Sequence, residues 1–480
     1  MLRTQKIKIK KGNKMYKYFD KICFNAKNLY NIGNFYIRQC LTGLKKDDKD
    51  ITTNEKEAIN YINNTIPHLN QIKLDYYNKR LNTESQKPIG ERKAVEKPAQ
   101  YELLSKDNSF LGYNLLDGIL KLNNQPDYIS LPGQVNQQVL KLLINDWKSF
   151  FKANKDYRVN PKKYKGKPKP PKYAKKNGRK TVTLSNQICK IKDNKYLRFP
   201  KTKLRLNIGK LGSINGKLKE VRVVPYSNYY EVEIVFEITD NIKAKTDEPK
   251  RIIGIDLGVD NFATIANNVG LQPVIIKGKR LKSLNRYYNK QRAYYYGILR
   301  QGKTQKEGQF TSKKLMKLDE TRDAKIQDFM HKASRTVVDY CINNNIDTII
   351  IGKNKQWKQN ANIGKVNTQK FVSIPYNQFV EKIKYKAEEI GIRVIVTEES
   401  YTSKASFLDY DIVPTYKEKS KEKHEFSGKR IKRGLYKTKD GKLINADVNG
   451  ALNIITKVVS DAFGTRDIGL VNSPQVLSIA

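Results

Sequence analysis

The sequence predicts a multidomain α+β protein, and three observations favour this class. The chain has 480 residues, too many for one ordinary core, so two or three domains are expected. Apolar residues make up 38% of the chain, which is enough to build folded domains. The hydrophobic period also changes, from helical spacing before Thr181 to strand-like alternation after it, and to mixed strands and helices after Ile252.

The amino-terminal part predicts one strand and then a helical region. Residues Lys6–Lys10 alternate as in a strand. Apolar residues then recur at helical spacing in "YFDKICFNAKNLYNIGNFYIRQ" and again in "QVNQQVLKLLINDWKSFF". The segment between them, up to about Asp127, is polar and mixed, and we expect helices with long loops there.

A basic segment, Asn160–Lys180, follows the helical region. Its prolines exclude a helix, and Lys or Arg occupies almost every other position. Such a run is either a solvated linker or a loop that tracks nucleic acid. The interleaved tyrosines and the overall charge favour the second interpretation. Its candidate nucleic-acid-binding residues are Lys165, Lys167, Lys169, Lys172 and Tyr173.

From Thr181 the alternation predicts an antiparallel sheet or a small β-barrel. "TVTLSN", "CKIKDNKYLRF" and "KLRLNI" read as strands with tight turns, and "EVRVVPYSNYYEVEIVFEI" reads as a hairpin with one apolar face. If the strand Lys6–Lys10 returns to join this sheet, the helical region becomes an insertion in it.

From Ile252 the expected order is β-β-β-α-β-α-β-α, a mixed sheet with helices on its faces. This is the element order of an RNase H-like domain. The expected strands are "IIGIDLGV", "FATIAN", "PVIIKG", "IDTIII" and "IRVIVT", and the expected helices are Thr311–Asn345, Ile374–Ile390 and Asp447–Val459.

The charge balance predicts a polyanionic partner. The chain has 93 Lys and Arg against 47 Asp and Glu, a formal charge of +46, and nucleic acid is the natural partner for it. No run of 18 apolar residues and no apolar signal core occur, so we expect no membrane contact and a cytoplasmic protein associated with a prokaryotic nucleoid. Four scattered cysteines suggest neither a disulfide framework nor a zinc site, and a reducing compartment fits them.

Few acids are placed for phosphodiester chemistry, which two divalent metals perform with three or four carboxylates. Asp256 ends the first strand after Ile252, Asp447 begins the last helix, and the pair Glu398 and Glu399 follows the last strand. Each aspartate has a plainer interpretation, Asp256 as a turn residue and Asp447 as a helix N-cap. Carboxylates favour hard cations such as Mg²⁺ or Mn²⁺.

Three motifs in order, "GIDLGVDN", "EESYTSKASFLDYD" and "NADVNGALNI", resemble the split RuvC nuclease domain of transposon-encoded TnpB proteins, relatives of type V CRISPR effectors. "KNLYNIGNFYIRQ" resembles the first recognition-lobe helix of that family, and "YKGKPKPPKY" resembles its wedge domain. The resemblance implies a wedge β-barrel from residues 1–10 and 166–249, a helical recognition domain from 11–165 inserted in it, and a RuvC RNase H-like domain from 250–480.

The resemblance also implies an activity, that of an RNA-guided DNA endonuclease of a mobile element. A guide RNA from the element end would pair with double-stranded target DNA next to a short adjacent motif. A magnesium- or manganese-dependent RuvC site would then cut the DNA, and we expect a monomeric ribonucleoprotein. Two alternatives stay open: a nuclease-inactive RNA-guided DNA-binding repressor, and a DNA-strand-transfer transposase.

Two departures from the family pattern matter. The family's middle glutamate usually ends the strand that corresponds to "IDTIII", where this chain has Gly352. Some members carry it at the end of the neighbouring strand, and by that pattern Asp256, Glu399 and Asp447 are the implied catalytic and metal-binding residues, with Glu398 as an alternate ligand or a residue behind the ligands. The family's four-cysteine zinc ribbon has no counterpart in residues 398–447, so zinc is not predicted.

Two further basic segments are candidate nucleic-acid contacts. "GKNKQWKQ" is either a heteroduplex contact with a stacking tryptophan or a solvated loop that packs its tryptophan as a lid. "KRIKRGLYK" is expected to contact phosphates. The candidates in the two segments are Lys353, Lys355, Trp357, Lys358, Lys429, Arg430, Lys432 and Arg433.

Overall fold

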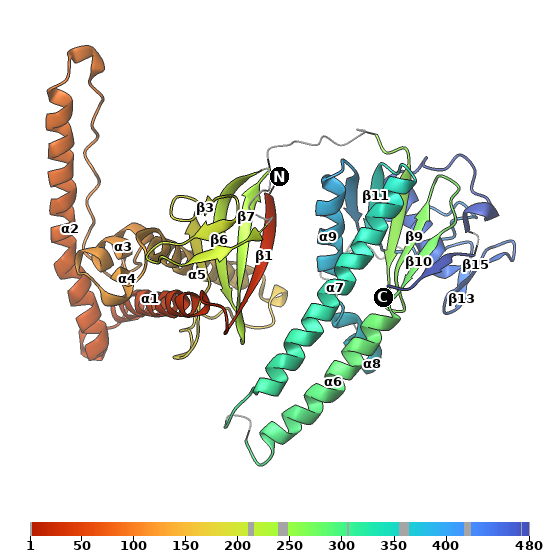
Figure 1. Cartoon of the computed structure of the whole chain (residues 1–480), viewed down its shortest axis with the longest axis horizontal. Helices are drawn as coiled ribbons and strands as arrows, with labels where there is room; N and C mark the ends of the chain where they lie inside the picture. The colour runs from red at the N-terminus through yellow and green to blue at the C-terminus, as the bar shows by residue number, and fades with distance from the viewer. Residues whose placement is uncertain are drawn as a thin grey trace. The chain divides into compact units, whose positions relative to one another are not determined.

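The computed structural model describes residues 2–209, 216–238, 248–304, 307–354, 364–416, 424–471 and 473–479. The chain divides into two compact units, Met1–Asn241 and Ile242–Ala480 (Figure 1). Both units combine helices and strands, so the predicted α+β class is confirmed. The predicted split into three domains stays a prediction.

The first unit contains a group of packed helices. The helix α1 contacts both α2 and α5, and α2 extends well beyond the other helices of the unit (Figure 1). The α-helices are α1 (Tyr16–Gly43), α2 (Thr53–Ser85), α3 (Tyr113–Leu122), α4 (Pro126–Ile129) and α5 (Gly133–Val159), and the 3₁₀ turns are η1 (Asp48–Asp50), η2 (Ile89–Glu91) and η3 (Pro161–Lys163).

The first unit also contains two antiparallel sheets. The larger has the strand order β1-β7-β6-β2, and the smaller has the order β3-β4-β5. Ile7 of β1 lies opposite Val232 of β7, so the predicted return of the first strand to this sheet is confirmed. The strands are β1 (Leu2–Lys10), β2 (Val182–Ser185), β3 (Lys190–Lys192), β4 (Tyr196–Arg198), β5 (Arg205–Asn207), β6 (Lys217–Pro225) and β7 (Tyr229–Glu237).

The predicted barrel is wrong. Over the described residues the larger sheet is open, with β1 and β2 as its two edges. Four strands are too few to close around a filled interior, which typically takes about eight. The sheet instead covers its apolar face with helices, because Phe19 of α1, Trp147 of α5 and Val232 of β7 belong to one continuous core.

The second unit is built on a six-stranded mixed sheet of order β12-β11-β8-β9-β10-β16. The strand β11 runs parallel to both β8 and β12, whereas β9 is antiparallel to β8 and β10. Five of these strands match the expected ones, and β16 had no predicted counterpart. The strands are β8 (Ile252–Leu257), β9 (Asn261–Asn267), β10 (Val274–Lys277), β11 (Thr348–Gly352), β12 (Arg393–Thr397) and β16 (Gln475–Leu477).

Helices cover both faces of this sheet. Ile253 packs with Phe329 of α7 and Phe379 of α9, whereas Ile252 packs with Ile454 and Ile455 of α10. The helices are α6 (Lys279–Arg300), α7 (Lys313–Asn343), α8 (Lys365–Val372), α9 (Tyr376–Glu388) and α10 (Ala446–Val458), with a 3₁₀ turn η5 (Ile468–Val471). A small separate sheet consists of β13 (Lys429–Lys432), β14 (Leu435–Lys437) and β15 (Leu443–Asn445). Within the described residues, none of the helices is long and apolar enough to cross a membrane.

The helix α10 lies directly on β8, and Gly254 permits this approach. A Cβ atom at Gly254 would lie 2.2 Å from the carbonyl oxygen of Ala451, a backbone atom of α10. Gly297 of α6 is a matched control, since a Cβ there meets nothing within 4 Å.

We therefore expect Gly254→Ala to destabilise the protein by about 1–3 kcal/mol or more, because α10 must move off the sheet. Gly297→Ala should instead stabilise it by up to about 1 kcal/mol, the difference in helix propensity. Urea unfolding midpoints of the two variants and the wild type measure both effects. Equal midpoints for Gly254→Ala and the wild type would contradict this packing.

Candidate active site and nucleic-acid surfaces

Asp256 lies on the α10 face of the sheet. Side chains alternate along β8, so Gly254 and Asp256 share the face opposite to that of Ile253 and Ile255. A Cβ atom at Gly450 of α10 would lie 3.2 Å from the Asp256 carboxylate. Two glycines, one on each element, thus leave room for this half-buried acid beneath the helix.

Asp447 lies in the first turn of α10, but it is not the helix cap. The side chain of Asn445 accepts the backbone N–H groups of Asp447 and Val448, at 3.0 and 3.1 Å. The Asp447 carboxylate is therefore available to other groups. It accepts hydrogen bonds from Asn261 Nδ2 at 2.6 Å and Arg430 Nη2 at 3.3 Å.

Glu399 comes to the same edge of the sheet from β12. Because β8, β11 and β12 are parallel, their carboxyl ends meet at one edge. The Cβ of Glu399 lies 3.2 Å from the position that a Cβ on Gly352 would take. The side chain thus starts beside the strand end where the family pattern expects its glutamate. Its Oε2 is buried and has no hydrogen-bond partner among the described residues.

Glu398 points its carboxylate to different partners. It pairs with Lys457 of α10, whose side chain is only 4% exposed, and it accepts the backbone N–H of Ser400 at 2.9 Å. Lys457 also donates to the carbonyl oxygens of Ser400 and Pro414, both at 2.9 Å. Burial opposes ionisation of Glu398, but the bonds from Lys457 and Ser400 outweigh it and lower its pKa.

The pKa values of Asp256 and Glu399 move in the other direction. Burial, and then the charge of Asp447, raise the pKa of Asp256 to about 7, although Arg430 opposes the shift. Burial, and then the charges of Asp256 and Glu398, raise the pKa of Glu399 to about 8. Asp256 therefore repels, and is repelled by, an acid on each side, and a cation between them would relieve this repulsion.

The donor set fits a hard divalent cation in its chemistry. All three side chains are carboxylates, and one buried oxygen of Glu399 lacks a partner. In the described part of the chain, however, no three Asp, Glu, His or Cys side chains already lie close enough to hold a metal ion. The acids share one sheet edge, but an ion would have to draw them together.

Basic side chains lie around these acids. Asp260, four residues after Asp256, pairs with Lys282 of α6 and with Arg433. Of the predicted phosphate contacts, Arg430 reaches Asp447 of the acid site and Arg433 reaches the neighbouring Asp260, and both arginines are exposed. Lys429 and Lys432 are exposed on the same β13 hairpin, and Lys353 directly follows β11. The predicted contacts Lys355, Trp357 and Lys358 lie outside the described residues.

The candidates in the basic segment lie in the first unit, whereas the acids lie in the second. All candidates of the basic segment are exposed, namely Lys165, Lys167, Lys169, Lys172 and Tyr173. They are therefore part of the surface of the first unit.

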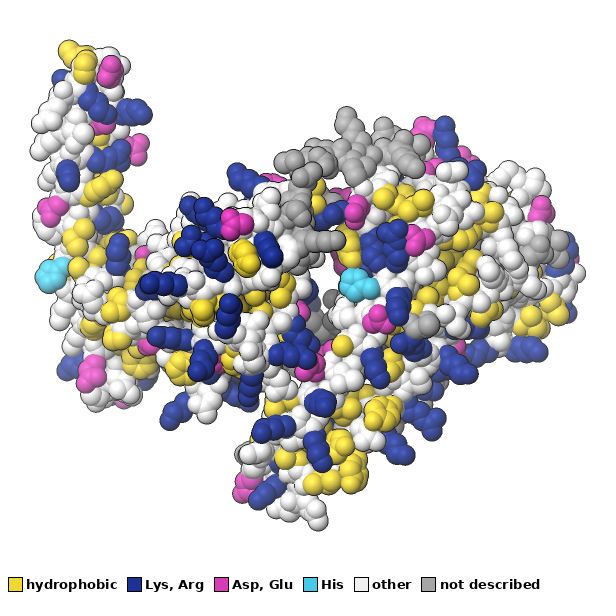
Figure 2. Space-filling view, in the orientation of Figure 1, with side chains coloured by type: hydrophobic (Ala, Val, Ile, Leu, Met, Phe, Trp, Pro, Cys, Tyr) yellow, Lys and Arg dark blue, Asp and Glu magenta, His cyan; other side chains and the backbone are white. Residues whose placement is uncertain are grey.

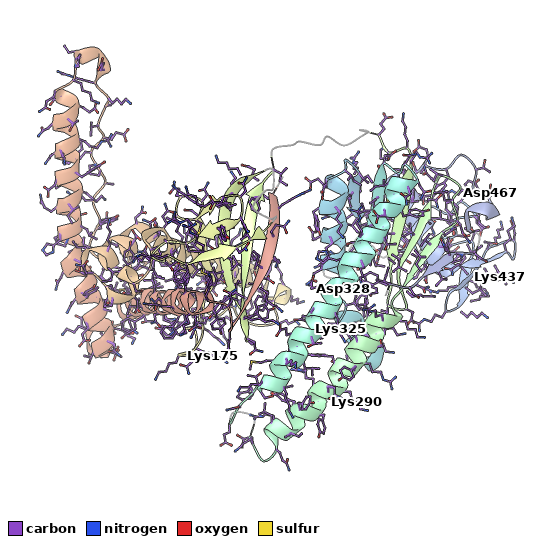
Figure 3. All side chains as sticks on the ribbon, in the orientation of Figure 1. Lys175, Lys290, Lys325, Asp328, Lys437 and Asp467 are labelled. Atoms are coloured by element: carbon purple, nitrogen blue, oxygen red, sulfur yellow. The ribbon has the colours of Figure 1, made fainter. Side chains whose placement is uncertain are left out.

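The sequence reasoning missed α6. This helix carries seven Lys and Arg and no acid, and it exposes Tyr287 by 61% and Tyr294 by 62%. Lys290 lies on it in Figure 3, and Figure 2 shows how widely Lys and Arg cover the visible surface. Only Leu281 and Asn285 of α6 are buried, so it lacks the apolar stripe by which other helices were found. The tyrosine-and-arginine pattern of "NRYYNKQRAYYY" was the available signal.

Comparison with known families covers the carboxyl-terminal half. Residues 229–358, which include Asp256, match the family OrfB_IS605, described as a probable transposase. Residues 376–454, which include Glu399 and Asp447, match the family described as Cas12f1-like, TNB domain. The resemblance to TnpB-like proteins predicted from the motifs is confirmed.

One curated relative is the CRISPR-associated endodeoxyribonuclease Cas12f1 of Sulfoacidibacillus thermotolerans. It is 29% identical over 224 residues, 44% of this chain and 48% of the relative, so the chain spans about half the length of that protein. Similar solved structures include a Cas12f1–sgRNA–target DNA complex (TM-score 0.31, 14% identity, 94% of this chain and 98% of that one). Another is Alicyclobacillus acidoterrestris C2c1 with single-guide RNA (TM-score 0.35, 8% identity, 92% and 70%).

Proposed function

We propose that this protein is an RNA-guided DNA endonuclease of a mobile element, which hydrolyses phosphodiester bonds of guide-matched DNA beside a short adjacent motif. The observation that carries the proposal is that Asp256, Glu399 and Asp447 come toward one edge of the sheet from β8, from the end of β12 and from α10. The raised pKa values of Asp256 and Glu399 agree with it. The match to a probable transposase family and the similarity to an endodeoxyribonuclease support it.

In this proposal Asp256, Glu399 and Asp447 hold Mg²⁺ or Mn²⁺, and Glu398 does not. The bound metal would supply positive charge to the scissile phosphate and activate water. Asn261 orients Asp447 through its amide N–H, and Lys277 in turn donates to Asn261 at 2.8 Å. The nearly buried Lys457 keeps Glu398 turned away from the other acids.

Nucleic acid is the partner that the charge supports. The net charge of +46, the basic segment, α6 and the exposed arginines of the β13 hairpin all offer phosphate contacts. We propose that these surfaces hold a guide RNA and its DNA target in a monomeric ribonucleoprotein.

Two observations favour an alternative, RNA-guided DNA binding without cutting. Gly352 replaces the family's usual glutamate, and the described acids do not form a ready-made metal cluster. The same experiment decides between the two candidates.

The protein should be purified with its co-expressed RNA and incubated with a plasmid that bears a guide-matched site. We expect the plasmid to be cut in Mg²⁺ only when the site matches, to stay intact in EDTA, and to be cut again when Mg²⁺ or Mn²⁺ is added. Gel-shift binding to the matched site without any cutting would reject the endonuclease in favour of the binding protein.

A further inference from the structure

We propose that residues 167–176, called the strap, bind the phosphates of a single-stranded RNA segment. In this proposal, contacts with α1 hold the strap in its binding conformation before RNA binds. The inference rests on the proposed function, since it states where the RNA of that protein binds. It concerns the first unit alone and is independent of the acids.

One face of α1 pins the backbone of the strap. Lys27, Asn31, Asn34 and Arg38 recur every three or four residues, so they lie along one side of the helix. Each of the four donates a side-chain hydrogen bond to a strap carbonyl. The acceptors are Lys176 O for Lys27 (2.9 Å), Ala174 O for Asn31 (2.9 Å), and Pro171 O for Asn34 (3.1 Å) and Arg38 (2.5 Å).

Two of these side chains, Asn31 and Asn34, also make a second hydrogen bond. Asn31 also accepts the backbone N–H of Ala174 at 2.8 Å, so its amide pairs with that residue as a neighbouring strand would. Asn34 is fully buried and accepts the indole N–H of Trp147 at 3.0 Å. The strap is therefore tied to the core of the unit and is not a free linker.

Half-buried residues recur at every third position of the strap, and an exposed lysine follows each of them. Pro168, Pro171 and Ala174 are half-buried, whereas Lys169, Lys172 and Lys175 are exposed; Pro170 is half-buried as well. Three residues per turn is the period of polyproline II, in which such lysines stand about 9 Å apart in a row. Proline also fixes the backbone before any ligand binds.

The lysines of the strap lie in a stretch of sequence that contains no acidic residue. No Asp or Glu occurs between Asp156 and Asp193. A fixed row of unneutralised cations is unfavourable without counterions, and a polyanionic strand that displaces those counterions gains affinity. The charge pattern thus points to a nucleic-acid strand.

Tyr173 indicates that the strand is unpaired. The residue is 46% exposed, and the Arg38 guanidinium lies 5.3 Å from the ring centroid. Exposed aromatic rings stack on bases that are splayed out of a helix, which a duplex does not offer. Under the proposed function, RNA is the partner that the protein keeps throughout, so we assign the strap to RNA.

The test is a fluorescence titration of the full-length protein with labelled oligouridine over a series of salt concentrations. Replacing Lys169, Lys172 and Lys175 with alanine should lower the slope of log K against log salt by about 2, since each single-strand phosphate contact contributes about 0.7. Asn31→Ala should weaken RNA binding by roughly tenfold at every salt concentration without changing the slope. The lysines remain, but the strap loses its hydrogen bonds to Asn31 and must be ordered when RNA binds. A merely structural role of Asn31 predicts an altered unfolding midpoint with unchanged RNA affinity.

The matched control is the alanine triple variant of Lys87, Lys219 and Lys384. Each of these partly or fully exposed lysines already pairs with a carboxylate, so the slope should stay at the wild-type value. If the lysine variant of the strap has the same slope as the control, the strap does not bind RNA phosphates and the proposal is wrong. A slope change with oligodeoxythymidine but not with oligouridine would reject the assignment to RNA. These titrations measure RNA binding and no DNA cutting. The protein can therefore fail the cutting assay and still show the expected slope change, so the two proposals are tested separately.

Discussion

Asp256→Asn should abolish DNA cutting while leaving RNA binding and target binding intact. Asparagine keeps the size of the side chain beneath α10, so the packing of Gly450 against it is preserved. It removes the charge that interacts with Asp447 and Glu399, and with it one of the three carboxylates that hold the cation in the proposed function. The loss should exceed the roughly 10–100-fold that removal of an outer partner of a metal site costs. Plasmid cleavage rates and gel-shift affinities measure the two properties separately.

Asp260→Asn is the matched control. Asp260 is four residues away on the same edge, but its carboxylate pairs with Lys282 and Arg433. The substitution should therefore change the cutting rate only a few-fold. Cutting by Asp256→Asn at the rate of the control would eliminate the acid site.

Glu399→Gln should lose cutting to a similar degree, whereas Glu398→Gln should retain it. The two glutamates are neighbours in sequence, yet the carboxylate of Glu398 is bound by Lys457 and the Ser400 N–H, and Glu399 has a buried oxygen without a partner. We therefore propose Glu399 as the ligand, because the ammonium group of Lys457 already neutralises the Glu398 carboxylate. Cleavage rates of the two variants over a range of Mg²⁺ concentrations distinguish a lost ligand from a general defect, because a lost ligand also shifts the Mg²⁺ requirement upward.

The pair of variants also tests the alternative assignment. If Glu398→Gln is inactive and Glu399→Gln cuts normally, the ligand is Glu398 and Lys457 must release it when metal binds. If both variants bind DNA and neither the wild type nor the variants cut, the binding protein is correct.

The regular elements were predictable because their apolar periods are local. Burial leaves a local signal, as branched residues in β8 and β11 and as helical spacing of apolar residues in α7 and α9. The observed bounds of these two helices lie within about two residues of those expected. The return of β1 to β7 was also foreseen, since a short alternating strand needs a partner. The helix α6 was missed because it buries almost nothing, and the barrel was wrong because strand number and closure leave no local signal.

The candidate acids, the strongly basic surface and the resemblance to TnpB proteins were all determined by the sequence itself, because residue type, charge and spaced motifs need no coordinates. Only the tertiary structure decided how these residues are used. It gave the helix cap to Asn445, it brought Asn261 and Arg430 to the carboxylate of Asp447, and it bound Glu398 to a nearly buried lysine. It also turned an apparent linker into a strap on α1. The physical reason is that a polar side chain is assigned by the partner that folding brings to it. Apart from the local cap by Asn445, these partners lie tens to hundreds of residues away along the chain.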